Sequence, residues 1–131
     1  MKLGILKRKG RGKDKMSNDV EHFDSFIGQS TNIFGRMDIH ASIRIDGKVQ
    51  GDLETPPHSR ITIALGKSGD VVGDIKAHRV LIAGKVHGNI YAAEHVELAR
   101  TAHVTGDISF QSIRVEHGAH VEGHLIKKAT K

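Results

Sequence analysis

One five-residue phrase occurs six times between residues 33 and 125, and this repetition limits the folds open to the chain. Each copy has an apolar residue, a variable residue, glycine, a second variable residue and a second apolar residue. The copies are IFGRM (33–37), VQGDL (49–53), VVGDI (71–75), VHGNI (86–90), VTGDI (104–108) and VEGHL (121–125). Their glycines lie about 18 residues apart, whereas repeats of paired helices need about 33 residues or more. The spacing predicts one coil of a solenoid per copy.

A second apolar pair, with one residue between its members, separates successive copies of the phrase. The pairs are Ile43/Ile45, Ile61/Ile63, Val80/Ile82, Val96/Leu98 and Ile113/Val115. Alternation with a period of two predicts strands, and β-branched side chains fit a pleated surface. Each coil would have two apolar strands, a turn at the glycine and a variable third side. We predict an all-β, single-stranded parallel β-helix of about six coils over residues 23–126.

Composition agrees with one narrow solenoid. The chain has 131 residues, 37% apolar content and no tryptophan, so it lacks the large side chains of many globular cores, but a column of stacked Val, Ile and Leu does not need them. There is no cysteine, which excludes disulfides and thiolate metal sites. The absence of cysteine also favours an intracellular location.

The positive net charge belongs to one end of the chain. Residues 1–15 carry seven basic residues and one acidic residue, whereas the rest of the chain carries 13 basic and 14 acidic residues. We therefore separate a basic tail at residues 1–22 from the β-helix, which is followed by a short basic end at residues 127–131. The glycines of the N-terminal tail argue against a stable helix and predict disorder in solution.

The start of the tail combines a short apolar hook with basic side chains. The hook (Met1, Leu3, Ile5 and Leu6) is too short for a transmembrane span or a secretory signal, but with Lys2, Lys7, Arg8, Lys9 and Arg11 it suits an anionic membrane surface, where each basic residue contributes about 1 kcal/mol. A solubilising tail and contact with nucleic acid are the alternatives. Nucleic acid is disfavoured because the folded part has no basic face and the tail has no aromatic residue for base stacking.

The repeats, the glycine–aspartate turns and the basic tail resemble the bactofilin family of bacterial cytoskeletal proteins. The resemblance is carried by IRIDGKVQGDL (43–53), by VHGNI (86–90), and by VEL (96–98) leading to VTGDI (104–108). It implies a right-handed, three-sided β-helix whose copies join end to end, without nucleotide, into filaments at the inner face of the cytoplasmic membrane. It also implies a scaffold that positions cell-envelope or peptidoglycan-processing proteins and influences cell shape.

The ends of such a solenoid are the predicted self-assembly surfaces, because an end coil exposes rows of unpaired N–H and C=O groups. Contacts between unlike ends would give a polar filament and contacts between like ends a nonpolar one; the resemblance favours like ends. The predicted contact residues are Ile27, Ile33, Phe34 and Met37 in the first coil, and Val115, Val121 and Leu125 in the last, with Phe110 as an aromatic anchor.

Aligned coils also predict two outward columns. One contains Arg36, Asp52, Asp74, Asn89, Asp107 and His124; we expect its Asp and Asn oxygens to accept backbone N–H groups at the turns, with a calcium ladder as the less favoured alternative. The other contains Arg44, Thr62, Leu81, Glu97 and Arg114, in which Glu97 would pair with Arg114.

Ten histidines keep an enzymatic alternative open. Hexapeptide-repeat acyltransferases and related zinc enzymes, which act as trimers, also use three-sided β-helices with histidine as general base or metal ligand. The nearest candidates for a cluster are His87, His103, His117, His120 and His124. However, the strict six-residue phase of the transferases is missing, and no serine or acid partner is placed recognisably. We therefore expect surface histidines, with no catalytic residue, metal site or cofactor.

Overall fold

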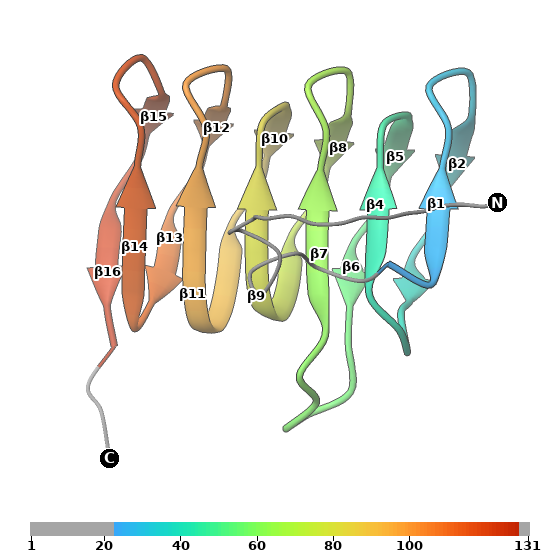
Figure 1. The fold of residues 1–131 in the computed structure, drawn as a ribbon, viewed down its shortest axis with the longest axis horizontal. Helices are drawn as coiled ribbons and strands as arrows, with labels where there is room; N and C mark the ends of the chain where they lie inside the picture. Colours follow the sequence, from blue (N-terminus) through green and yellow to red (C-terminus); the bar gives the residue numbers. More distant parts are fainter. Residues whose placement is uncertain (1–22, 129–131) are drawn as a thin grey trace, which may run out of the picture.

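The computed structural model describes residues 23–128, which wind into six coils stacked along one axis (Figure 1). All strand pairs between coils are parallel. The predicted β-helix is therefore confirmed. The N-terminal tail at residues 1–22 and the last three residues, 129–131, lie outside the described residues.

Each coil contributes one strand segment to each of three faces. The first face contains β1 (Ser25–Ile27), β4 (Ile43–Ile45), β7 (Thr62–Leu65), the second halves of β9 (Ile75–Ile82) and β11 (Ile90–Leu98), and β14 (Ser112–Val115). The second contains β2 (Asn32–Phe34), β5 (Lys48–Gln50), β8 (Asp70–Val72), β10 (Lys85–His87), β12 (His103–Thr105) and β15 (His120–Glu122). The third contains β3 (Met37–Asp38), β6 (Leu53–Glu54), the first halves of β9 and β11, β13 (Ile108–Phe110) and β16 (Leu125–Lys127).

The winding is right-handed. In Figure 1 the strands of the first face lie toward the viewer and run upward, and the chain then passes over the top to the fainter second face behind them. Because the coils advance from β1 on the right to β14 on the left, this sense of rotation makes a right-handed helix.

The core is a continuous column of inward aliphatic side chains. On the first face, Ile45, Leu65, Ile82 and Leu98 lie in register and are almost completely buried. On the second face, Val49, Val71, Val86 and Val104 form a matching row. Burial of such a side chain stabilises the fold by about 1.5–3 kcal/mol. Each interior coil packs against a coil on both sides, which explains how a chain with few aromatic residues builds a core.

One predicted apolar pair was in the wrong register. The structure pairs Ile63 and Leu65, not Ile61 and Ile63, with Ile43 and Ile45. Ala64, not Thr62, therefore lies between Arg44 and Leu81 in the outward column, and Thr62 is buried. The apolar residues at 61, 63 and 65 alternate uniformly, so spacing alone does not distinguish the two registers.

The glycines of the repeated phrase lie at the corner between the second and third faces, and all six have positive φ, between 120° and 156°. A Cβ added at any of the last five would lie 1.9–2.2 Å from the carbonyl oxygen of the corresponding glycine one coil earlier. A side chain cannot fit in that space. Gly35 lies in the first described coil, and a Cβ added there would meet no described atom within 4 Å.

The residue after each glycine links successive coils. The Oδ1 atom of Asp52 accepts a hydrogen bond from the backbone N–H of Asp74 at 2.9 Å, and Asp74 in turn accepts one from Asn89 at 2.9 Å. Asn89 and Asp107 continue this Asx ladder to the N–H groups of Asp107 and His124, at 2.8 and 3.0 Å. The predicted role of these oxygens as backbone acceptors is confirmed.

Replacing Gly106 by alanine should lower the free energy of unfolding by on the order of 3 kcal/mol, because the new Cβ combines an unfavourable φ with a backbone clash. Gly35→Ala should cost less, because its φ is unfavourable but its surroundings are open. Gly28→Ala is the control, since its Cβ would contact nothing within 4 Å. Urea unfolding followed by circular dichroism measures all three, and an unchanged midpoint for Gly106→Ala would contradict the role of the corner.

Candidate assembly surfaces

The strands of the two end coils have a partner on one side only. In the first coil, β1, β2 and β3 pair with β4, β5 and β6. In the last, β14, β15 and β16 pair with β11, β12 and β13. No other described strand pairs with these six, so backbone N–H and C=O groups point along the axis at both ends. Such open edges are templates for another strand.

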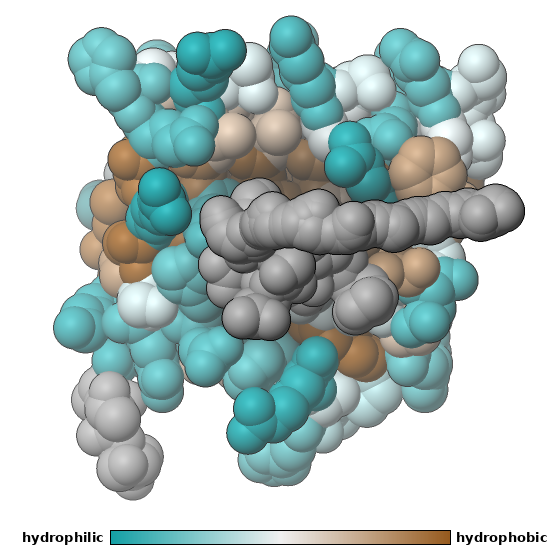
Figure 2. All heavy atoms as spheres, in the orientation of Figure 1, coloured by the Kyte–Doolittle hydropathy of each residue, from teal (hydrophilic) through white to brown (hydrophobic). Residues whose placement is uncertain are grey.

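Large exposed hydrophobic side chains gather at the same two ends. Among residues 23–128, six such side chains are exposed, and five of them belong to the end coils. Phe26 and Phe34 lie in the first coil, and Val115, Leu125 and Ile126 in the last. Figure 2 shows hydrophobic surface at the left edge of the molecule, over β14 and β16. A grouped apolar surface of this kind marks an interaction site more often than scattered single residues do.

The predicted contact residues occupy different positions within these coils. Phe34, Val115 and Leu125 are exposed. Ile27, Ile33, Met37 and Val121 lie in terminal strands but are half-buried against the core. All seven remain candidates for an end contact.

Phe110 is placed differently. It is buried in β13, one coil before the end, and pairs in register with Lys127 of β16. Its ring belongs to the core beneath the last coil, so it supports the end from inside and does not reach the assembly surface.

Phe26 and Ile126 were missed as candidate contacts. Phe26 lies opposite Arg44 in the outward column of the first face, between Ser25 and Ile27. Ile126 lies in β16, which continues to Lys127, one residue beyond the predicted end of the β-helix. The signal for Phe26 was the alternation of its strand, because an inward Ile27 requires an outward Phe26.

Histidine side chains make polar contacts between the last two coils. His95 Nδ1 lies 2.7 Å from Ser112 Oγ, and His124 Nδ1 lies 3.1 Å from Asp107 Oδ1. Glu97 was predicted to pair with Arg114; the two lie opposite each other in register, but the contact that Glu97 makes is with His95, whose Nε2 lies 3.2 Å from Glu97 Oε2.

Two carboxyl groups near this end have a lowered pKa. The pKa of Asp107 is lowered mainly by the hydrogen bond from the backbone N–H of His124 and then by the imidazole of the same residue. The pKa of Glu122 is lowered by its hydrogen bond with the His120 side chain, with a smaller effect of the charge of that imidazole. Both carboxyl groups are exposed to solvent, so the energies involved are small.

The fold and its ends define a short parallel β-solenoid whose two end coils have open strand edges within residues 23–128. Residues 25–126 match the family described as "Bactofilin: Polymer-forming cytoskeletal", and the chain belongs to that family. Bactofilin BacO of Myxococcus xanthus (strain DK1622) is 33% identical over 103 residues, covering 72% of this chain and 82% of BacO. Bactofilin BacP of the same organism is 31% identical over 109 residues, covering 83% of this chain and 43% of BacP. No solved structure matches the chain.

The predicted membrane-binding residues, which lie between positions 1 and 11, are outside the described residues. Within residues 23–128, no helix is long and apolar enough to cross a membrane. Binding of the tail to a membrane therefore stays a prediction.

The lowered pKa of Asp107 gives a pH-dependent prediction. A carboxyl group with a lowered pKa in the folded state stabilises the protein above its unfolded pKa of about 3.9, and this contribution is lost as the pH falls through the folded value. Asp107→Asn keeps an Oδ1 acceptor for His124 but removes the charge. The melting temperature of the wild-type protein should exceed that of the variant near neutral pH, and the difference should shrink as the pH falls to about 2. A difference independent of pH would contradict a contribution from the charge.

Proposed function

We propose that the protein is a cytoplasmic scaffold whose copies assemble end to end, without nucleotide, into filaments. Its N-terminal tail would hold the filaments at the inner face of the cytoplasmic membrane, where they position cell-envelope or peptidoglycan-processing proteins and influence cell shape. The observation that carries the assembly step is the coincidence of open strand edges and exposed hydrophobic side chains at both ends of the described coils. Membership of a family described as polymer-forming cytoskeletal supports it.

An end contact would satisfy two kinds of group at once. Strand pairing would use the outward N–H and C=O groups of an end coil, and the apolar side chains there would be buried. Burial of one side chain such as Phe34 or Leu125 stabilises by about 1.5–3 kcal/mol, while association costs about 4–15 kcal/mol. Several such side chains together with three strand edges are therefore needed for a stable contact.

We further propose that like ends meet. In a contact between unlike ends, the first coil of one copy would stack on the last coil of another. Arg36 would then lie next to His124 in the outward column that contains the Asx ladder. His124 has no carboxylate or amide oxygen to accept the N–H of Arg36, so the ladder, which inside the chain runs from Asp52 to His124, would not continue across the junction. A contact between like ends is self-complementary about a two-fold axis and does not require the ladder to continue. The resulting filament is nonpolar.

Charged substitutions at the ends test both assembly and polarity. Phe34 is 73% exposed and points outward, and Leu125, which continues the inward row of Ile108, is 50% exposed at the open end. Phe34→Asp and Leu125→Asp should therefore disrupt an end contact, and circular dichroism checks that the last coil of Leu125→Asp stays folded. If like ends meet, each single variant keeps one intact interface and should form dimers, and the double variant should be a monomer of 14.3 kDa. Val72→Asp is the matched control, because Val72 is also 50% exposed but lies in the middle of the second face. Light scattering after gel filtration, with electron microscopy of the filaments, measures the outcome.

Contacts between unlike ends, or an absence of end contacts, would give different results. If unlike ends meet, both single variants lose the same interface and should be monomers. Filaments that survive in the double variant would overturn end-to-end assembly. Discrete trimers of the unaltered chain would instead favour the hexapeptide-repeat transferase or zinc enzyme.

Attachment to a membrane is proposed for the tail because its apolar hook and its basic residues provide two weak signals together. In a filament, each bound subunit raises the effective concentration of the next tail at the surface. Weak binding by one tail would thereby become firm binding by a filament.

Deletion of residues 1–11 should release filaments from anionic vesicles, because it removes the hook and most of the basic residues of the N-terminal tail. The filaments themselves should remain assembled. Vesicle flotation measures binding, and electron microscopy of the same samples measures filament formation. A second variant that replaces Lys7, Arg8, Lys9 and Arg11 with glutamine but keeps the hook separates the electrostatic contribution, and neutral vesicles are the lipid control. Flotation that is unaffected by the deletion would contradict the role of the tail.

A further inference from the structure

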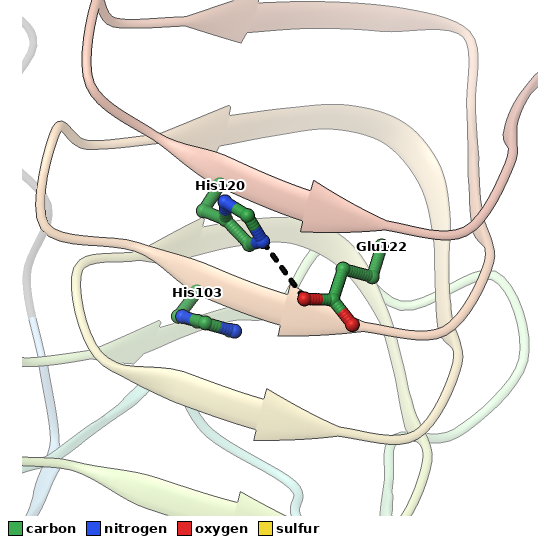
Figure 3. Close-up of side chains that lie close together, drawn as sticks. All are labelled: His103, His120 and Glu122. Atoms are coloured by element: carbon green, nitrogen blue, oxygen red, sulfur yellow. Dashed lines mark hydrogen bonds and ion pairs between the residues drawn. The ribbon is translucent and has the colours of Figure 1, made fainter.

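Two histidines and a glutamate form one small cluster on the second face, at the junction of the last two coils. His103 opens β12 and His120 opens β15, and the two residues pair in register. Their ring centroids are 4.5 Å apart, with an angle of 38° between the ring planes. Glu122 follows on the same strand as His120, with its Oε2 atom 2.9 Å from His120 Nε2. Figure 3 shows the three side chains grouped over these two strands.

The three side chains bring a metal-binding donor set together. One ligand atom from each residue lies within 4.8 Å of the other two. Two imidazole nitrogens and one carboxylate oxygen suit Zn²⁺ and similar divalent transition metals, with water in the fourth position. Bond lengths of about 2.0–2.2 Å place tetrahedral ligands about 3.4 Å apart. Closing the site therefore needs side-chain movements of about 1 Å, which the exposed side chains of His120 and Glu122 can make.

The backbone already fixes much of this arrangement. In-register residues on adjacent parallel strands are held about 4.8 Å apart by the hydrogen bonds of the sheet, and residues two apart on one strand point to the same side. Lys85 lies opposite His103 on β10, on the side away from Glu122. It is thus the in-register basic neighbour of the cluster, and its ammonium group lies on a flexible chain that can turn away from a bound cation.

The other histidine–carboxylate pairs are less complete. His78 pairs with Glu94, His95 with Glu97 and His124 with Asp107, each with one histidine. Among residues 23–128, the group of three His, Asp or Glu side chains whose ligand atoms all lie within 4.8 Å of one another consists of His103, His120 and Glu122. The hydrogen bond between His120 and Glu122 explains the position of those two residues but not that of His103, whose ring lies against His120.

We propose that His103, His120 and Glu122 form a Zn²⁺-type divalent metal site that ties the last coil to the coil before it. Two ligands come from β15 in the last coil and one from β12 in the preceding coil, so a bound ion stabilises the stacked position of the last coil. That coil has much of its apolar surface exposed, at Val115, Leu125 and Ile126. The site involves a single chain and is independent of whether copies assemble.

Calorimetric titration of the full chain with Zn²⁺ tests the site. We expect one ion per chain in the tightest class of binding. His103→Ala and His120→Ala should each weaken that class at least about tenfold, because each removes one of three protein ligands, and Glu122→Gln should weaken it less than either. His124→Ala is the matched control: it removes an exposed histidine of the same coil that pairs with a carboxylate outside the cluster. Binding by this control should equal that of the wild-type chain.

Two further measurements separate loss of the site from loss of folding. Circular dichroism without metal should give the same spectrum for all variants. Zn²⁺ should raise the melting temperature of the wild-type chain and of His124→Ala, by mass action, but not that of His103→Ala. X-ray absorption at the zinc edge should find two imidazoles in the first coordination sphere. Zinc binding that is unchanged in His103→Ala would overturn the proposal. So would no binding by the wild-type chain at about 100 µM Zn²⁺, where a site with a Kd of about 1 µM would be almost fully occupied.

Discussion

The close approach of successive coils at the glycine corner is the constraint on which the rest of the structure depends. The backbones meet there so tightly that a Cβ would lie about 2 Å from the carbonyl oxygen of the coil before it. This approach brings the Asp or Asn oxygen of one coil within reach of the N–H group of the next, as in the bond from Asp74 to Asp52. Corner and ladder together fix the register of the coils, and the register aligns the inward Ile, Leu and Val residues into one column.

The same register leaves the ends incomplete. An interior coil has strand partners and apolar contacts on both sides, whereas the first and last coils have them on one side. Val115 shows the consequence: it is in register with the buried Leu98, but it is exposed because none of the described coils covers it. The assembly that we propose would continue the packing of the interior across the gap between two chains, whereas the Asx ladder begins at Asp52 and ends at His124.

Much of this could be predicted from the sequence because the repeated phrase marks one corner of every coil. The register of β7 was predicted wrongly because Ile61, Ile63 and Leu65 alternate without a break and the preceding loop has no fixed length. Phe110 was placed at the end because its exposure depends on whether β16 covers it, which local sequence does not determine. The pairing of His103 with His120 follows from the repeat, because each lies three residues before a phrase glycine; the positions of the histidines without their phase in the repeat do not indicate it.

The junction between the last two coils depends on polar contacts between side chains. Three histidine contacts cross it on or near all three faces: His95 with Ser112, His124 with Asp107, and His103 with His120. Aliphatic packing is thinner here than in the interior, since Leu125 and Ile126 are exposed and Val121 is only partly buried. Polar contacts between side chains therefore carry a larger share of the attachment of the last coil. Because that coil also presents one of the two assembly surfaces, whatever strengthens or weakens these contacts acts directly on the edge that a second copy would meet.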